Sequence, residues 1–417
     1  MFEITFLRHG ESTGNVEGYF QGQSEYPLSE KGKEQSKALA TRWQEEGVSF
    51  DKIICSPLSR AKQTAEIINT SIQSQIEFDP IWMERDYGIL SGMRYKDFRE
   101  RTPRPDFINL YDSIGETGES DWELFLRAGQ ALQRLFRQPP GKYLVVSHGG
   151  LLNKVINNIF GIKPQANFQG VRFRFNNTRY TKVSYSTEDN HYRIFCVNEC
   201  AHIDNEKVLE TPYQFILLRH GESEGNVQQI FQGQLDYPLS SKGREQAKAL
   251  SDFWAMNKMV FDKIFTSPLL RARETAEIVG KGLGNLFPED NELLKEVDVG
   301  KLSRLPVANF HRQYPVREDH CNPFIPIGET WYDLYLRTGK FIQSLMKKSP
   351  GKYLIVSHGG TINSFLWAAL GIVPGVPNHT LRFHLENTSY AVLGYRPNEN
   401  SWHLAKAGDQ RHLQSST

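Results

Sequence analysis

The 417-residue sequence has few cysteines, and these are Cys55, Cys196, Cys200 and Cys321. Four cysteines in a chain of this length are too few for a disulfide-stabilised scaffold, which fits a reducing compartment. Two of them lie near His202 with a spacing that hints at a metal site. A structural zinc ion needs four ligands, and no fourth candidate lies nearby. We therefore interpret residues 196–202 as part of a linker between domains.

The sequence also lacks an excess of charge and a long apolar run. It has 49 Lys and Arg residues against 48 Asp and Glu residues, a formal net charge of +1. No global field therefore attracts nucleic acid or an anionic membrane, and anion binding has to be local. No run of about 18 apolar residues is present, and the first residues, MFEITFLRHG, lack the features of a signal peptide. We expect a cytoplasmic protein with neither nucleic-acid nor membrane partners.

The sequence does contain a long internal repeat. Residues 6–39 and 217–250 are identical at 24 of 34 aligned positions. The segment GKYLVVSHGG at 141–150 returns as GKYLIVSHGG at 351–360. This repeat is far longer than the period of about 20–50 residues that marks a solenoid, so it indicates a duplicated domain. The predicted domains are residues 1–207 and 208–417.

Each half alternates predicted strands and helices. In the first half, Ile4–Leu7 reads as a buried strand and 29–46 as a helix capped by Ser29. The strand DKIIC is followed by Pro57, which we place at the first position of the next helix. A helix over 119–137, the strand KYLVVS and the helix GGLLNKVINNIFG complete the pattern. This alternation predicts a three-layer α/β/α sandwich in each half, with a mostly parallel sheet whose ligands bind beyond the carboxyl ends of the strands.

Cationic and imidazole side chains are predicted at these strand ends. Arg8 and His9 end the first strand, and His148 follows the third strand just before two glycines. Arg60 lies near the start of a helix, where the macrodipole disfavours a cation by roughly 0.3–1 kcal/mol unless an anion binds there. The second half repeats these residues as Arg219, His220, Arg271 and His358.

Arginines and histidines in this arrangement favour phosphoryl chemistry. Guanidinium groups bind phosphate oxygens in pairs, and a neutral imidazole is a competent nucleophile near neutral pH. The sequence has no Walker loop, no Asp-rich metal cluster and no GxGxxG motif. The positive charge therefore has to come from side chains, and we expect neither a metal ion nor a cofactor.

The motif set LRHGE, SPLxRAxxTAE, a later Glu and VSHGG occurs in both halves and resembles the histidine phosphatase superfamily, also called phosphoglycerate-mutase-like. The resemblance covers nearly the whole chain. It implies that His9 is the phosphorylated nucleophile, that Glu84 is the proton donor, and that Arg8, Arg60 and His148 bind the transferring phosphoryl group. It assigns the corresponding roles in the second half to His220, Glu296, Arg219, Arg271 and His358, and it places Asn15 and Asn226 against the phosphate.

Three functions are compatible with these motifs. The leading hypothesis is a phosphatase that hydrolyses small phosphorylated molecules in two active sites. A phosphomutase of the same family is the alternative. The resemblance implies that such a mutase has a longer insertion between the acid and the second histidine. Here Glu84 and His148 lie 64 residues apart, and Glu296 and His358 lie 62 apart, which favours hydrolysis. In the third function one half is a non-catalytic module, although neither half has lost its nucleophile or its acid.

The two halves differ most in the segments predicted to form the pocket walls. After the acid, the first half continues with Arg85 and YGILSG, whereas the second continues with Val297 and VGKLSR, so that Arg304 replaces a glycine. These differences predict different leaving groups for the two halves, and the sequence leaves the substrates open. It also leaves open whether the protein is a monomer or a homodimer. The predicted wall segments are residues 16–27, 85–118, 227–238 and 297–328.

Overall fold

The computed structural model describes residues 1–101, 107–203, 209–309, 328–374 and 380–413. The chain divides into two compact units. The first comprises Met1–Val208 with Glu399–His403, and the second comprises Leu209–Asn398 with Leu404–Thr417. The boundary predicted between residues 207 and 208 falls outside the described ranges, and Cys321 also lies outside them.

The first unit alternates strands and helices as predicted. Its strands are β1 (Phe2–Arg8), β2 (Lys52–Cys55), β3 (Ile76–Phe78), β4 (Lys142–Ser147), β5 (Gly170–Phe173), β6 (Tyr180–Ser186) and β7 (His191–Glu199). Its helices are α1 (Thr13–Glu17), α2 (Glu30–Glu45), α3 (Ser59–Ile72), α4 (Tyr95–Arg101), α5 (Asp121–Phe136) and α6 (Gly149–Phe160).

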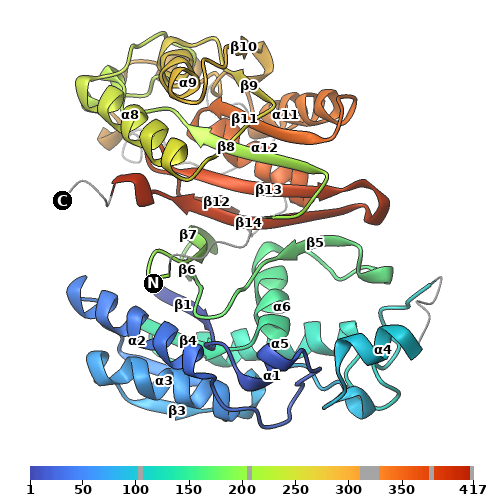
Figure 1. The fold of residues 1–417 in the computed structure, drawn as a ribbon. Coiled ribbons are helices and arrows are strands. Elements are labelled where there is room, and N and C mark those ends of the chain that lie inside the picture. The colour runs from blue at the N-terminus through green and yellow to red at the C-terminus, as the bar shows by residue number, and fades with distance from the viewer. Residues whose placement is uncertain (102–106, 204–208, 310–327, 375–379, 414–417) are drawn as a thin grey trace. The chain divides into compact units, whose positions relative to one another are not determined.

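The sheet of the first unit has the strand order β7-β6-β1-β4-β2-β3. Strands β1, β4, β2 and β3 are parallel, and β6 and β7 are antiparallel additions at one side. Both faces of β1 are covered, because Leu7 packs in a cluster with Trp43 of α2 and Ala61 of α3, while the Phe2 ring lies 5.3 Å from that of Phe136 in α5. The apolar run of β1 is therefore that of an interior parallel strand between two helical layers (Figure 1).

The second unit repeats this order of elements. Its strands are β8 (Tyr213–Arg219), β9 (Lys263–Thr266), β10 (Pro288–Asp290), β11 (Gly351–Ser357), β12 (Thr380–Phe383), β13 (Tyr390–Arg396) and β14 (Ser401–Asp409). Its helices are α7 (Glu224–Val227), α8 (Ser241–Met256), α9 (Leu270–Gly282), α11 (Trp331–Met346) and α12 (Gly359–Leu370).

The sheet of the second unit has the order β10-β9-β11-β8-β13-β14, with β10, β9, β11 and β8 parallel and β13 antiparallel to β8. Leu218 packs on one face of the sheet with Trp254 of α8 and Ala272 of α9. On the other face the Phe215 ring lies 6.2 Å from that of Phe365 in α12. The predicted fold class, a mostly parallel α/β architecture in two repeated domains, is confirmed.

The start of α3 differs from the prediction. Pro57 was expected at the first helical position, but α3 begins at Ser59, after the extended residue Leu58. Arg60 is therefore the second residue of the helix, closer to its positive end than the sequence suggested. Helix α9 begins in the same way, with Arg271 at its second position. Within the described residues, no helix is long and apolar enough to cross a membrane.

Candidate active site

The neighbouring parallel strands β1 and β4 bring two histidines together. Arg8 is paired with Ser147 in the β1/β4 register, so the residues that follow, His9 and His148, leave the sheet side by side. Their ring centroids lie 5.1 Å apart, and both side chains are buried. The second unit places His220 and His358 with the same centroid separation of 5.1 Å. This is the edge of the sheet where the strand pattern predicted ligand binding.

The His9 ring is held in one tautomer. Its Nδ1 lies 2.7 Å from the carbonyl oxygen of Gly10, which can only accept, so Nδ1 carries the hydrogen and Nε2 keeps a lone pair. Burial, followed by the nearby Arg60 and Arg8 charges, lowers the pKa of His9 well below its ordinary value. His9 is therefore neutral at neutral pH and keeps a lone pair on Nε2, and His220 has the same environment.

The second histidine of each pair is hydrogen-bonded to a serine that directly follows a strand, just before the helix that carries the arginine. His148 Nε2 lies 2.7 Å from Ser56 Oγ, and Arg60 Nε donates to His148 Nδ1 at 3.2 Å. Burial, then Arg60 and His9, lowers the pKa of His148 well below its ordinary value.

The corresponding histidine of the second unit differs in one contact. His358 Nε2 lies 2.8 Å from Ser267 Oγ. Within the described part of the chain, however, His358 Nδ1 and Arg271 Nε are buried without a hydrogen-bond partner. In the first unit the equivalent atoms, His148 Nδ1 and Arg60 Nε, are hydrogen-bonded to each other; in the second unit the free donor Arg271 Nε can bind a ligand oxygen.

Backbone carbonyls hold the guanidinium groups in place. Arg60 donates from Nη1 to Ser24 O at 2.9 Å and from Nη2 to Gly22 O at 2.7 Å. Arg8 donates from Nη1 to Phe175 O at 2.7 Å, while its buried Nε has no partner among the described residues. Burial lowers the pKa of Arg60 to about 10, which leaves it cationic at neutral pH. The two cations are thus oriented before any ligand arrives, as electrostatic stabilisation of a transition state requires.

Glu84 lies at the start of α6, beside the two histidines. Its carboxylate accepts hydrogen bonds from the backbone N–H groups of Arg85 at 2.8 Å, Gly150 at 3.0 Å and Leu151 at 3.1 Å. A Cβ atom at Gly150 would collide with this carboxylate, which explains the second glycine after His148. The backbone therefore fixes the carboxyl group without neutralising it by a cation.

Glu296 is held in the same way, with one addition. It accepts from the N–H groups of Val297, Gly360 and Thr361, and the Thr361 hydroxyl adds a contact at 3.3 Å.

The amide oxygen of Asn15 is hydrogen-bonded within the protein. Its Oδ1 accepts from Ser12 N at 3.1 Å, from Ser12 Oγ at 3.0 Å and from Asn177 Nδ2 at 3.1 Å. The Nδ2 group is thereby directed away from these partners and can donate to an anion. Asn226 repeats the arrangement with Ser223 and Asn387. All residues predicted for the two sites thus lie at the carboxyl ends of the parallel strands, and their individual roles stay predictions.

Comparison with known proteins places this geometry in a family. A family model described as the histidine phosphatase superfamily, branch 1, matches residues 4–198 and 215–409. The chain belongs to the histidine phosphatase superfamily. The two matched segments confirm the predicted family and its tandem repetition in one chain.

Individual relatives of this histidine phosphatase superfamily protein each match one half of it. The probable phosphoglycerate mutase GpmB of Escherichia fergusonii is 34% identical over 189 residues, which are 44% of this chain and 86% of that protein. Among solved structures, a mycobacterial glucosyl-3-phosphoglycerate phosphatase is 25% identical with a TM-score of 0.41, over 46% of this chain and 97% of the other. The phosphoserine phosphatase of Entamoeba histolytica is 25% identical with a TM-score of 0.42, over 48% and 99%.

The sequence analysis missed an arginine that holds the acid-bearing loop of this superfamily member. Arg127 of α5 donates to the carbonyl oxygens of Ile81, Met83 and Glu84, and it pairs with Glu119 through two hydrogen bonds of 2.6 Å. The second unit repeats this clamp with Arg337 and Glu329. The signal was present, because GESDWELFLRAG and GETWYDLYLRTG share their Gly-Glu start and their Leu-Arg-x-Gly end.

The linker interpretation of residues 196–202 was wrong. Cys196 lies in β7, and Cys200 is buried. His202 Nε2 donates to Thr178 Oγ1 at 3.1 Å, next to Asn177, whose Nδ2 donates to the His9 carbonyl oxygen at 3.1 Å. In the ranges that the structure covers, no three His, Cys, Asp or Glu side chains are grouped closely enough for a metal ion. The segment supports the backbone of His9 through Thr178 and Asn177, and the repeated Asn-Thr dipeptide at 177–178 and 387–388 was its signal.

His202 and its counterpart His412 should make the fold sensitive to acid. Burial lowers the pKa of His202 to about 3 and that of His412 to about 4. The unfolded chain, with a histidine pKa of about 6.5, binds protons first as the pH falls, so stability present above about pH 6.5 is lost toward lower pH. Each histidine contributes a slope of up to about 1.4 kcal/mol per pH unit.

We expect His202→Gln to reduce the fall of the unfolding temperature between about pH 7 and pH 5. The exposed His384→Gln serves as the control and should leave the profile as it is. The same fall in His202→Gln and in the unmodified protein would show that this histidine accepts its proton without unfolding.

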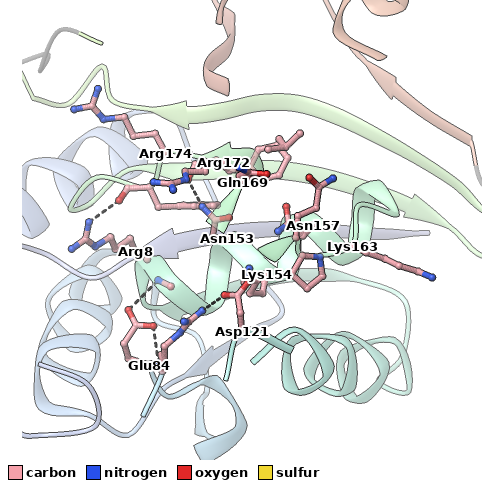
Figure 2. Close-up of a pocket in the computed structure, with 18 of the residues that line it drawn as sticks. Arg8, Glu84, Asp121, Asn153, Lys154, Asn157, Lys163, Gln169, Arg172 and Arg174 are labelled. Atoms are coloured by element: carbon pink, nitrogen blue, oxygen red, sulfur yellow. Dashed lines mark hydrogen bonds and ion pairs between the residues drawn. The ribbon is translucent and has the colours of Figure 1, made fainter. Parts of the chain in front are cut away.

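A cavity of about 490 Å³ opens beside the candidate site of the first unit. Arg8 and Glu84 lie at one side of it, and Lys154 and Lys163 line it further out (Figure 2). The walls were expected from 16–27 and 85–118, of which 102–106 lie outside the described residues. Arg85, Tyr87 and Tyr95 do line the cavity, but residues of 16–27 do not, and much of the wall comes from 149–175, which the sequence analysis missed. Side chains of α6 reach the cavity because α6 starts at the ligand-binding edge of the sheet, and the end of β5 is bound to α6 by Asn153 Nδ2, which donates to Phe173 O at 2.5 Å.

Proposed function

We propose that the protein is a metal-independent phosphatase that hydrolyses small phosphomonoesters through a phosphohistidine intermediate, with one active site in each unit. One observation carries the proposal: each unit has its own buried pair of histidines 5.1 Å apart, next to two arginines held by carbonyl groups and a glutamate held by backbone N–H groups. Neither unit needs a residue of the other to complete this set.

In the first step, the Nε2 lone pair of His9 attacks the phosphorus atom. The bond between phosphorus and the ester oxygen breaks, and Glu84 gives its proton to the leaving alkoxide. Arg8 and Arg60 stabilise the charge on the three equatorial oxygens. The Gly10 carbonyl oxygen, 2.7 Å from Nδ1, stabilises the positive charge that the ring gains when Nε2 is phosphorylated.

In the second step, a water molecule takes the place of the alcohol. The Glu84 carboxylate accepts a proton from the water, whose oxygen attacks phosphorus while the bond to Nε2 breaks. Inorganic phosphate leaves, and His9 regains its lone pair. His220, Arg219, Arg271 and Glu296 would act in the same way in the second unit.

A phosphomutase is the second candidate. The similarity to probable phosphoglycerate mutases at 34% identity favours it. A mutase has to keep water away from its phosphohistidine until the product of the first half-reaction is rephosphorylated. The short separation between Glu84 and His148 and the wide cavity beside Glu84 favour hydrolysis instead.

Trapping the intermediate tests the proposal. After rapid mixing with a phosphomonoester labelled on phosphorus and quenching in base, we expect label on His9 and His220 that is lost in acid. Ser and Cys should carry none. Release of label to water distinguishes the phosphatase from the mutase, which would pass the label to a second alcohol. Label that survives acid and is lost in base would place the covalent bond on another residue type and exclude this mechanism.

A further inference from the structure

A buried charged cluster lies on the cavity wall of the first unit, away from the phosphoryl site. Asp121 accepts from Arg85 Nη2 at 2.5 Å through Oδ1 and from Lys154 Nζ at 2.6 Å through Oδ2. The side chains of Arg85, Asp121 and Lys154 are only 9%, 6% and 12% exposed. Figure 2 shows Asp121 and Lys154 on the side of the cavity opposite Arg174. We call these three residues the Arg85 cluster.

The Arg85 cluster carries an unbalanced charge. It contains two cations and a single carboxylate, and buried cations are normally matched by buried anions because desolvation of an unmatched charge is costly. The rest of the cavity does not supply the missing anion. Among the described residues that line it, six are cationic, whereas Glu84 and Asp121 are the carboxylates. Glu84 is held by backbone N–H groups on the catalytic side.

The second unit shows that neither the fold nor the phosphoryl site requires the Arg85 cluster. The repeat places Val297, Trp331 and Ser364 at the positions of Arg85, Asp121 and Lys154. Val297 packs with Leu302 and other apolar side chains, and Ser364 Oγ lies 2.9 Å from Thr338 Oγ1. All three charges are absent together from these positions, although the histidines, arginines and glutamate of the second unit keep their geometry.

A cluster that is charged in one unit and replaced by neutral side chains in the other points to a difference in the leaving group. We infer that the Arg85 cluster is a second anion subsite, through which the first unit selects phosphomonoesters whose leaving group carries a further negative charge, a carboxylate or a second phosphate. The inference deepens the proposed function and rests on it. The cavity of about 490 Å³ is lined by Arg8, Glu84 and Lys154, and it can hold both the phosphoryl group and the second anionic group of such a small molecule.

The replacements predict a weaker preference for the second unit. The Trp331 ring lies 5.7 Å from that of Trp367, and Val297 belongs to an apolar cluster with Val299 and Leu302. The Arg382 guanidinium lies over the Trp331 ring, 4.9 Å from its centroid, so this wall keeps one cation but, among its described residues, has no counterpart of the Arg85 cluster. The second unit therefore favours a further negative charge on the leaving group less than the first unit does.

Two series of phosphomonoesters with graded chain length test the inference. One series ends in a carboxylate and the other in a hydroxyl group, and an alkyl bisphosphate series distinguishes a carboxylate from a second phosphate. The measurements use the full chain with His220→Ala, so that the first unit acts alone. We expect kcat/KM to favour the anionic series at one chain length by about tenfold or more, and Lys154→Ser to reduce this preference about 10- to 100-fold. The complementary full chain with His9→Ala should show a smaller preference for the anionic series.

Controls separate this inference from the proposed function. Lys62→Ser removes an exposed lysine of α3 in the same unit and should not change the preference. If Lys154→Ser lowers the unfolding temperature, Lys154→Gln and Arg85→Val are measured instead. The preference of the first unit for the anionic series, measured with the cluster intact, tests the inference without any of these variants. Equal kcat/KM for both series in the first unit would overturn the anion subsite while leaving the phosphatase proposal intact.

A binding measurement covers the case in which the phosphatase proposal itself fails. If no hydrolysis depends on His9, thermal unfolding of the double variant His9→Ala/His220→Ala still reports the subsite. The anionic series should raise the unfolding temperature more than the hydroxyl series does, and Lys154→Ser should remove the difference. Equal shifts for the two series would overturn the subsite.

Discussion

His9→Ala is expected to abolish hydrolysis of one group of phosphomonoesters by about 10⁴-fold or more and to leave the other group unchanged. His220→Ala should have the reciprocal effect. The reason is structural: each histidine has its own tautomer-fixing carbonyl, its own two arginines and its own glutamate. The measurement is a panel of phosphomonoesters assayed against the full-length chain and both variants.

The double variant His9→Ala/His220→Ala should be inactive toward the whole panel, and His191→Ala, at the start of β7 and away from the candidate site, should resemble the unmodified protein. The reciprocal pattern fails if His9→Ala alone removes every activity. If, in addition, no phosphorylated ligand raises the unfolding temperature of that variant, the second unit is a non-catalytic partner of the first.

Glu84→Gln should slow turnover of alkyl phosphates by roughly 10²–10⁴-fold. The amide keeps the size of the carboxyl group, and with its oxygen at the Oε1 position it can still accept from Arg85 N and Leu151 N, but it has no acidic proton to give to an alkoxide. p-Nitrophenyl phosphate needs less protonation of its leaving group, so its hydrolysis should be slowed less. The measurement is kcat for a series of leaving groups of rising pKa, in the chain with His220→Ala.

Glu119→Gln is the matched control for this substitution, because Glu119 contacts Arg127 and not the reacting atoms. It should affect all leaving groups alike. A Glu84→Gln loss that is equal across the leaving-group series would remove Glu84 from the acid role and leave it a positioning residue.

The strand ends could be predicted because the chain repeats them. An Arg-His pair after an apolar run and a His-Gly-Gly after a β-branched run place both histidines at the same edge of a parallel sheet, as β1 and β4 confirm. The helix start near Pro57 could not be placed from sequence, since Leu58 is extended and the helix begins one residue later. The first helical hydrogen bonds are accepted by the carbonyl oxygen of Leu58, from Ala61 N and Lys62 N, and not by a residue before Pro57.

The Arg85 cluster shows what sequence alone leaves out. Its residues come from the loop after the acid, from α5 and from α6, and nothing local to any of them indicates that Asp121 receives both cations. The same holds for His202, which contacts Thr178 across 24 residues. Both arrangements depend on tertiary packing, and the repeat helps only after the equivalent positions have been compared in space.

The neutral state of the buried histidines has a consequence for protons. With His9 and His148 uncharged, the positive charge next to the histidines comes from Arg8 and Arg60. In the proposed mechanism these two guanidinium charges equal the two negative charges of a phosphomonoester dianion, and neither histidine is a cationic acid. The proton of the leaving alkoxide then has to reach it through Glu84.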